Sequence, residues 1–581
     1  MTISRRRERF AAGNELKTEF RKKRTMKKKT SSLALGAAFA ALAAVAAESP
    51  VPVPAMPRSS AADAMAQVKT TQWIEEALPR KWAEISKDES SAADKAKALQ
   101  EEAIKSGYYL TRIEEKDGEI VSKPGTFGEI AVKFRPTGTN TAETAEGRYF
   151  SAKQIKEKLA KHGVAEGRPF NYYRLYDAFK ELNADPDIQA NVRLVQPSDG
   201  DDRSLAVNVD VEEERPLHLV ATVDNFGTGP DHGDYAADKW MARGTAQYLN
   251  LWRAGHAVTA NGFTSLDNTL WGGSASYYAP FSLGNRDASL TLHGGFSELS
   301  ADDVVPNIDV EGQGWFFGAQ ASVDLVPSWE DSLRFALGLT WRRVWDQLVL
   351  HDDGKTDKLN RNSVELMPLS AALVYTSAGI DSWIGRNYAT LEVSHDVGAD
   401  EKELKRQRFT AEEDYTIVRA QLARIQALGT PGSYAGRNIL FGRVETQWSD
   451  SPLVSAEQMG VGGALSVRGY KEREHLGDHA AVASVEWRTP LLLGYLGGGR
   501  EGETARDRLQ LVLFGDAGWF KIDEPIAGQD DDDDLLASVG AGLRFAWGDN
   551  ALLRFDWGFP LKETDDSDRS GRGHVMLQAQ F

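Results

Sequence analysis

The sequence predicts a membrane all-β fold, a barrel that follows two small α/β modules. Three observations lead to this prediction. From about residue 217 to the end of the 581-residue chain, apolar and polar residues alternate with period two between recurring turn residues. Residues from about 60 to 213 instead mix helical and strand patterns. The N-terminal region has the features of an export signal, which favours a membrane barrel over a soluble sandwich.

Composition excludes several classes of protein. The chain has 68 Lys and Arg against 85 Asp and Glu, a net charge of −17, and no cysteine. A disulfide scaffold, a zinc–cysteine site, a thiol nucleophile and a lipid anchor on cysteine are therefore excluded. After residue 50, no apolar run reaches the roughly 18 residues that a transmembrane helix needs, so we expect none in the mature chain.

The first residues of the chain are strongly basic. Residues 1–29 contain twelve Lys or Arg and three Asp or Glu. A nucleic-acid-binding arm is one interpretation. We favour a secretory signal peptide that starts at Met26, because Lys27–Lys29 precedes the uncharged Leu- and Ala-rich run 33–45 and small residues follow it. Loss of residues 1–47 removes +9 from −17 and leaves −26, which argues against a nucleic-acid partner.

The chain then divides into segments by pattern. We expect an extension with signal peptide (1–47), a linker (48–66), a first module (67–135), a second module (145–213) and the barrel (217–581). In the second module, helices are predicted at Ser151–His162 and Asn171–Asn183, and alternating strands at Ile188–Leu194 and Leu205–Val211. The first module is a fainter copy, with a helix at 91–106 and strands at Tyr108–Ile113 and Phe127–Phe134.

Sixteen candidate strands follow, an even number as bacterial outer-membrane barrels have. They start near Leu217, Trp240, His256, Trp271, Asp287, Gln313, Leu333, Ser363, Asn387, Tyr415, Asn438, His479, Leu509, Leu535, Ala551 and His574. One face of each strand is apolar and would meet lipid. The other mixes small residues with Arg, Glu and Asp, as a wet lumen would. We expect long polar loops on the outer side at 351–362, 396–412, 521–534 and 562–573.

Two strings of residues carry the most specific signal. The segment Glu457–Tyr470 is followed by Gly477-Asp478, and Phe514–Gly518 lies in a later strand. Both strings resemble the two-partner secretion transporters, the haemolysin secretion/activation family of ShlB, FhaC and HecB. That family is a branch of the BamA-type superfamily, in which POTRA modules precede a β-barrel.

The resemblance extends over about residues 90–581. Gly167–Phe170 with Asn183–Pro186 looks like the second POTRA module, Ile104–Tyr109 looks like part of the first, and Val211–Pro216 leading to Asp224–Gly227 looks like the approach to the first barrel strand. The first module departs from the family pattern because it lacks a clear opening strand. Pro79 also interrupts the helical stretch 68–87.

In the family that the chain resembles, the sixth outer loop folds back into the lumen. The resemblance implies that its tip (Val467, Arg468, Gly469 and Tyr470) reaches the barrel wall, where Arg468 meets an acidic residue of the second string. Alternation agrees: if Leu511 and Leu513 face lipid, Phe514 and Asp516 face the lumen, where an acid can meet an arginine.

The candidate wall partners of Arg468 are Asp516, Glu486, Phe514 and Gly518. Glu486 is lumenal by the same alternation, and arginine suits the role because its planar fork pairs bidentately with a carboxylate. Gly469 permits a tight tip. The alternative is that Arg468 has no special role, because any wide barrel has lumenal Arg and Asp. Most such pairs contribute only about 0–1 kcal/mol to stability. The terminal Phe581 is the expected C-terminal barrel signal.

The function that the resemblance implies is export of a secreted exoprotein, unfolded, from the periplasm to the surface of a Gram-negative-type bacterium. The POTRA modules would bind the partner in the periplasm, by strand addition to a sheet edge. Further partners would be outer-membrane lipid and the barrel assembly machinery. An assembly factor of the same superfamily is the alternative, followed by a diffusion porin and a barrel enzyme. We expect no enzyme, cofactor or metal, because the sequence has no G-x-S-x-G, H-E-x-x-H or P-loop motif.

Overall fold

The computed structural model describes residues 70–581 except for short gaps at 89, 137–143, 197–202, 228–238, 285, 306–307, 327–330, 353–354, 378–380, 431–432, 434–436, 491–506, 526–532 and 548–549. The expected signal peptide and linker lie outside the described residues. None of the described helices is long and apolar enough to span a membrane.

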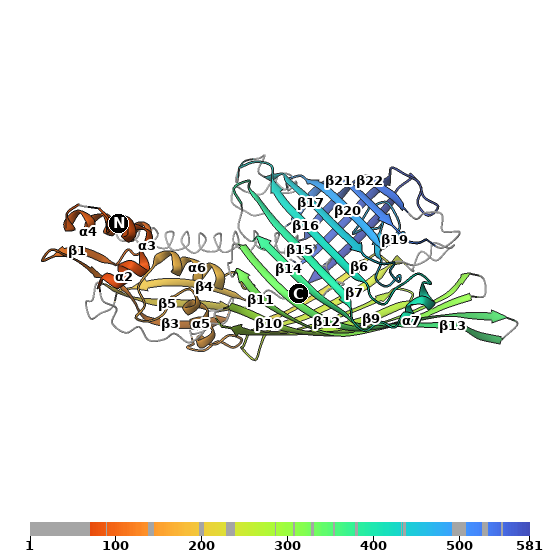
Figure 1. Ribbon diagram of the computed structural model, residues 1–581, viewed down its shortest axis with the longest axis horizontal. Helices are drawn as coiled ribbons and strands as arrows, with labels where there is room; N and C mark the ends of the chain where they lie inside the picture. Colours follow the sequence, from red (N-terminus) through yellow and green to blue (C-terminus); the bar gives the residue numbers. More distant parts are fainter. Residues whose placement is uncertain are drawn as a thin grey trace, which may run out of the picture.

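A closed antiparallel barrel forms the larger part of the molecule (Figure 1). Its strands are β6 (Leu217–Asp224), β7 (Met241–Leu251), β8 (His256–Ser265), β9 (Leu270–Leu283), β10 (Arg286–Val305), β11 (Ile308–Val326), β12 (Asp331–Asp352), β13 (Lys355–Leu366), β14 (Pro368–Ser377), β15 (Gly385–Asp396), β16 (Thr416–Ala427), β17 (Ile439–Ser449), β20 (His479–Arg488), β21 (Asp507–Lys521), β22 (Asp533–Trp547), β23 (Ala551–Pro560) and β24 (Arg572–Gln580). Both β13 and β14 pair with β12 and together make one span. The barrel thus has sixteen spans, which confirms the predicted fold class.

The two faces of the strands differ as predicted. Leu337 and Leu513 are about half exposed on the outer face, whereas Asp516 and Phe514 are buried on the inner face. The barrel closes where β24 pairs with β6, so every span has two neighbours. Because a closed sheet pairs its backbone groups internally, such a fold is stable in lipid.

One predicted loop is wrong. The segment 351–362 is not a loop but the end of β12 and the start of β13, which pair in register out to Asp352 and Lys355. Figure 1 shows this hairpin extending beyond the other strands, at the end of the barrel away from the modules. The sequence of this segment is mostly polar, so the apolar alternation that marks a strand ends there while backbone pairing continues.

The second module is a three-stranded sheet covered by two helices. Its elements are β3 (Thr126–Pro136), α5 (Ala152–Lys161), α6 (Tyr172–Leu182), β4 (Ile188–Val195) and β5 (Ser204–Glu213), in the sheet order β3-β5-β4. The predicted helices and the last two strands agree with this. The strand Phe127–Phe134, expected in the first module, belongs here instead: it is part of β3, which runs parallel to β5, and both phenylalanines are buried in the core of the second module.

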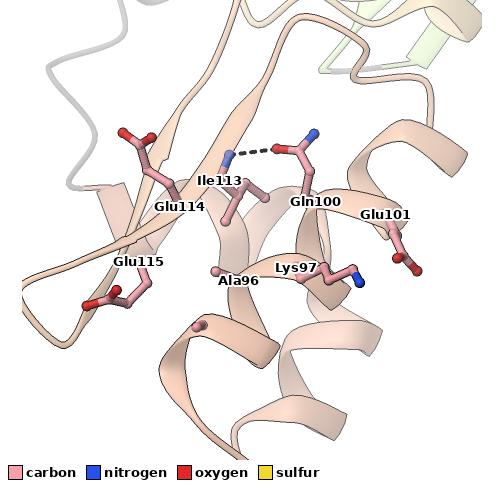
Figure 2. A pocket seen from close by; sticks show the side chains of 8 residues that line it. Ala96, Lys97, Gln100, Glu101, Ile113, Glu114 and Glu115 are labelled. Atoms are coloured by element: carbon pink, nitrogen blue, oxygen red, sulfur yellow. Dashed lines mark hydrogen bonds between the residues drawn. The ribbon is translucent and has the colours of Figure 1, made fainter.

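The first module packs three helices against a two-stranded hairpin. Its elements are α2 (Thr70–Ala77), α3 (Pro79–Ile85), α4 (Ala92–Lys105), β1 (Arg112–Lys116) and β2 (Glu119–Lys123). The predicted strand Tyr108–Ile113 is mostly wrong, because Tyr108 follows α4 in a turn and its ring packs edge-on against Trp73 at 5.1 Å. Figure 2 shows a shallow groove between α4 and β1, where the Gln100 side chain accepts a hydrogen bond from Ile113 N–H (2.7 Å).

Polar contacts join the second module to the barrel. The Lys161 ammonium lies 2.5 Å from the Asp287 carboxylate at the start of β10. At the end of β7, beside the turn to β8, the buried Asn250 accepts a hydrogen bond from Gln154 (2.6 Å) and donates one to the Tyr149 carbonyl (3.0 Å). The modules therefore meet the barrel at the end where these turns lie, opposite the extended hairpin (Figure 1).

Candidate functional site

The loop between β17 and β20, residues 450–478, folds inward and is largely buried. It is the sixth loop on the side away from the modules and is called loop 6 below. It carries a short hairpin, β18 (Met459–Val461) with β19 (His475–Gly477). The tip residues Val467 and Tyr470 are fully buried against β20, β21 and β22 through Val482, Phe520 and Leu536. Loop 6 is thus a packed part of the interior.

Arg468, at the tip of loop 6, is held by the barrel wall. Its Nε and Nη2 donate to the two carboxylate oxygens of Asp516 at 2.7 and 2.8 Å, and its backbone N–H donates to the same carboxylate at 3.1 Å. Nη1 donates to Glu486 at 2.6 Å. The guanidinium also lies 3.5 Å from the centre of the Phe514 ring. The structure therefore brings together Arg468 and three of its four predicted wall partners in direct side-chain contact.

A larger charge network surrounds this ion pair. Asp556 on β23 lies 3.6 Å from Arg468 and pairs with Arg544 and Arg554 at 2.6 and 2.7 Å. Arg488 pairs with Glu486 at 2.6 Å. Acids and bases thus alternate around the buried guanidinium, which offsets the cost of burying each charge.

The network includes residues that the sequence analysis missed. Asp556 has the lumenal parity of its strand, since Leu553 and Trp557 face outward, so alternation could have identified it. Glu457 of loop 6 pairs with Arg342 of β12 (2.7 Å) and Arg419 of β16 (3.3 Å). Both arginines are lumenal by alternation too, but nothing in the pattern pairs them with Glu457.

Glycines let the loop tip approach the wall closely. Gly469 has φ +97°, and a Cβ there would lie 2.8 Å from the Gly558 carbonyl on β23. A Cβ on Gly558 would lie 2.5 Å from the backbone of the loop tip. Gly518, the fourth predicted wall partner, makes room instead of a polar contact: a Cβ there would lie 2.5 and 2.6 Å from Val461 and Val467.

The remaining predicted site residues, Tyr470 and Phe581, make their hydrogen bonds to backbone groups outside the charge network. The single proton of the Tyr470 hydroxyl is shared between the Lys562 carbonyl (2.8 Å) and the Ala537 carbonyl (3.1 Å), which ties the tip to β22 and to the loop after β23. Phe581 lies at the barrel seam, where its backbone exchanges hydrogen bonds with Leu219 of β6, and its side chain is 74% exposed. Within the ranges that the structure describes, no three His, Asp or Glu side chains converge as metal ligands would.

Comparison with known proteins gives a family match and structural neighbours. The family model described as haemolysin secretion/activation protein ShlB/FhaC/HecB matches residues 204–545. The structure is similar to CdiB from Escherichia coli (TM-score 0.63, 16% identity, 92% of each chain covered) and to CdiB from Acinetobacter baumannii (0.60, 14%, 91% of each). It is also similar to BamA from Haemophilus ducreyi lacking POTRA domains 1–3 (0.50, 12%, covering 90% of this chain and 100% of that one). The comparison with curated proteins gave no match.

Proposed function

The chain belongs to the haemolysin secretion/activation protein family of ShlB, FhaC and HecB, and on this premise we propose how it exports its partner. Membership makes it a two-partner secretion transporter in the outer membrane of a Gram-negative bacterium. The α/β modules are the two POTRA modules and bind the partner exoprotein in the periplasm. The partner then passes unfolded through the barrel lumen. The proposal includes no enzymatic step.

The observation that carries this proposal is the buried contact of Arg468 with Asp516 and Glu486. A contact of this kind keeps loop 6 folded inside the lumen, because removing one partner of a buried ion pair costs about 3–5 kcal/mol. A diffusion pore needs no such device. We therefore assign to loop 6 the role of shaping and closing the lumen until the partner engages.

The edge strand β4 of the second module is the proposed docking edge for the partner. It ends the sheet order β3-β5-β4, and its Val192, Leu194 and Val195 are 37–43% exposed. An extended segment can add to such an edge through main-chain hydrogen bonds. In the first module, by contrast, the Gln100 amide oxygen already accepts from the Ile113 N–H at the β1 edge (Figure 2). Its NH2 group donates to the carbonyl of Thr111, just before β1.

Assembly of the transporter itself requires a second partner. We propose that the barrel assembly machinery inserts the chain, with Phe581 as the terminal signal. Phe581 lies at the seam that closes last in a sequential barrel, beside Leu219 of the first strand. Outer-membrane lipid then surrounds the exposed apolar face of the strands.

Deletion of the gene, with mass spectrometry of secreted and outer-membrane proteins, tests the proposal. Loss of one or a few large proteins from the surface or medium, with the membrane profile intact, is the expected result. A broad fall in other barrels would instead assign the chain to barrel assembly. No change in either fraction would overturn the export function.

A further inference from the structure

The loop between β15 and β16, residues 397–415, turns inward at the outer end of the barrel. We call it loop 5. It contains α7 (Glu401–Gln407). Asp400 caps the start of this helix, because its side chain accepts hydrogen bonds from the N–H groups of Lys402 and Glu403. Leu404 on α7 is buried against Val364 and Leu366 of β13 and against Val454 of loop 6.

The position of these contacts places loop 5 over the lumen. In the β12–β13 register, Leu366 lies opposite Arg342 and Val364 lies opposite Val344. Opposite residues of an antiparallel pair share a face of the sheet. Arg342 reaches Glu457 of loop 6, so this face is the lumenal one. Helix α7 therefore covers the inner side of the wall at the mouth (Figure 1).

Arg408, directly after α7, connects three loops through one guanidinium. Its Nη1 donates to both carboxylate oxygens of Asp478, at 2.7 and 2.9 Å, and to the Leu453 carbonyl at 2.7 Å. Its Nη2 donates to the carbonyl of Asp523. Leu453 and Asp478 belong to loop 6. Asp523 belongs to residues 522–525, which directly follow β21 and which we call loop 7.

Asp478 is the other half of this connection and is fully buried. Besides Arg408, it accepts hydrogen bonds from the N–H groups of Leu453 (2.9 Å) and Asp523 (2.8 Å) and from the Gln458 amide (2.9 Å). The carboxylate thus binds loops 6 and 7, and Arg408 adds loop 5. Without Arg408, loop 5 would lose its charged attachment to both neighbours.

We propose that Arg408 is a positioning residue that latches loops 5, 6 and 7 over the mouth of the pore. The latch differs from the Arg468 contact, which fixes the tip of loop 6 to β20 and β21 deeper in the lumen. The Arg408–Asp478 pair must separate for an exported chain to leave, so this inference rests on the proposed function. Water that enters with the passing chain solvates both charges and lowers the cost of their separation.

Conductance of the purified full-length protein in planar lipid bilayers tests the latch without an export assay. We expect Arg408→Ala to raise the mean conductance several-fold, with an unchanged folded band on unheated gels. Lys405→Ala is the matched control, since Lys405 lies on the same helix and makes only an exposed pair with Glu401. Arg408→Lys keeps the positive charge but loses the planar, bidentate guanidinium. We therefore expect a mean conductance between those of the wild type and Arg408→Ala. Conductance of Arg408→Ala equal to that of Lys405→Ala would overturn the proposal.

A reversible cross-link tests the same latch from the other side. Ser451 Oγ of loop 6 donates to the Glu412 carboxylate of loop 5 at 3.2 Å, and the native chain has no cysteine. In Glu412→Cys/Ser451→Cys, closing the pair by oxidation or with a short bifunctional thiol reagent should lower conductance and stop secretion. Reduction of the disulfide should restore both, and the single-cysteine variants should be unaffected.

The two readouts separate the two hypotheses. A verified cross-link with wild-type conductance and secretion would disprove the latch. If gene deletion stops export but the cross-link does not affect it, the proposed function stands and only the latch is disproved. Conversely, the purified protein could show the expected conductance changes while deletion of the gene leaves the secreted proteins unchanged. That combination would support the latch and contradict only the export function.

Discussion

Arg468 and Asp516 are 48 residues apart in the chain and form a bidentate ion pair inside the barrel, with both guanidinium–carboxylate distances below 3 Å. The Arg468 backbone N–H donates to the same carboxylate. One wall residue therefore fixes both the side chain and the backbone of the loop tip. This double attachment defines the position of loop 6 more tightly than a side-chain pair alone.

Arg468→Ala should release the tip of loop 6. The substitution leaves Asp516 and Glu486 buried without their shared cation, a loss of about 3–5 kcal/mol for a buried pair. We expect altered pore conductance and a marked fall in secretion of the partner, with the barrel still in the membrane. Conductance in planar bilayers and secretion assays check this. Normal secretion with wild-type conductance would show that the role assigned to Arg468 is wrong.

Gly469→Ala should destabilise the same tip without removing any charge. Gly469 has φ +97°, and its new Cβ would press on the Gly558 carbonyl at 2.8 Å. Backbone strain alone costs about 1–3 kcal/mol. The matched control is Gly284→Ala, because Gly284 has φ +64° with nothing within 4 Å of the added Cβ. The melting temperature of the folded barrel, measured by gel shift, should fall further for Gly469→Ala than for Gly284→Ala. Equal melting of both variants would exclude the close approach as the cause.

Strand alternation was sufficient to predict the sixteen spans and the lumenal side of Asp516 and Glu486. Alternation follows directly from the geometry of a strand with lipid on one side. The starts of the helices in the second module were equally predictable from the sequence, because the side chains of Ser151 and Asn171 cap α5 and α6. Each of these features depends only on neighbours along the chain.

Contacts between distant segments were not predictable in this way. Strand β3 pairs with β5, about 80 residues later, and no local pattern shows which module its Phe127 joins. Arg408 lies in a loop, where side chains have no period, so its pairing with Asp478 depends on how two loops fold together. The extended hairpin of β12 and β13 was missed because its sequence is mostly polar and lacks the apolar alternation.

Substitutions on β4 should weaken partner recognition without affecting the pore. Val192→Asp with Leu194→Asp places two charges on the exposed apolar face next to the proposed docking edge. We expect reduced secretion and loss of cross-linking to the partner's N-terminal region, with unchanged bilayer conductance. The control is Arg193→Ser, on the opposite face of the same strand, where Arg193 makes an exposed pair with Asp210 worth about 0–1 kcal/mol. Secretion at the control level in the double variant would refute docking at β4.

Asn250→Ala should loosen the second POTRA module from the barrel. Asn250 adopts φ +57° at the end of β7, beside the β7–β8 turn, and is hydrogen-bonded to Gln154 and to the Tyr149 carbonyl. Alanine removes these bonds and tolerates a positive φ less well than asparagine. Spin labels at Lys153→Cys in the module and Trp383→Cys in a barrel turn can report the distance between them, because the chain has no other thiol.

The expected result for Asn250→Ala is a broader distribution of label-to-label distances, because the module then samples several orientations. Trp252→Ala is the control: Trp252 is 70% exposed in the β7–β8 turn, two residues after Asn250, and its ring contacts lie within the barrel, on His256 and Tyr277. A narrow, wild-type distribution in Asn250→Ala would mean that the Lys161–Asp287 pair and the bonds of Arg253 to the carbonyls of Gly147 and Arg148 hold the module without Asn250. A broad one would make this turn the joint through which a bound partner is aligned with the lumen.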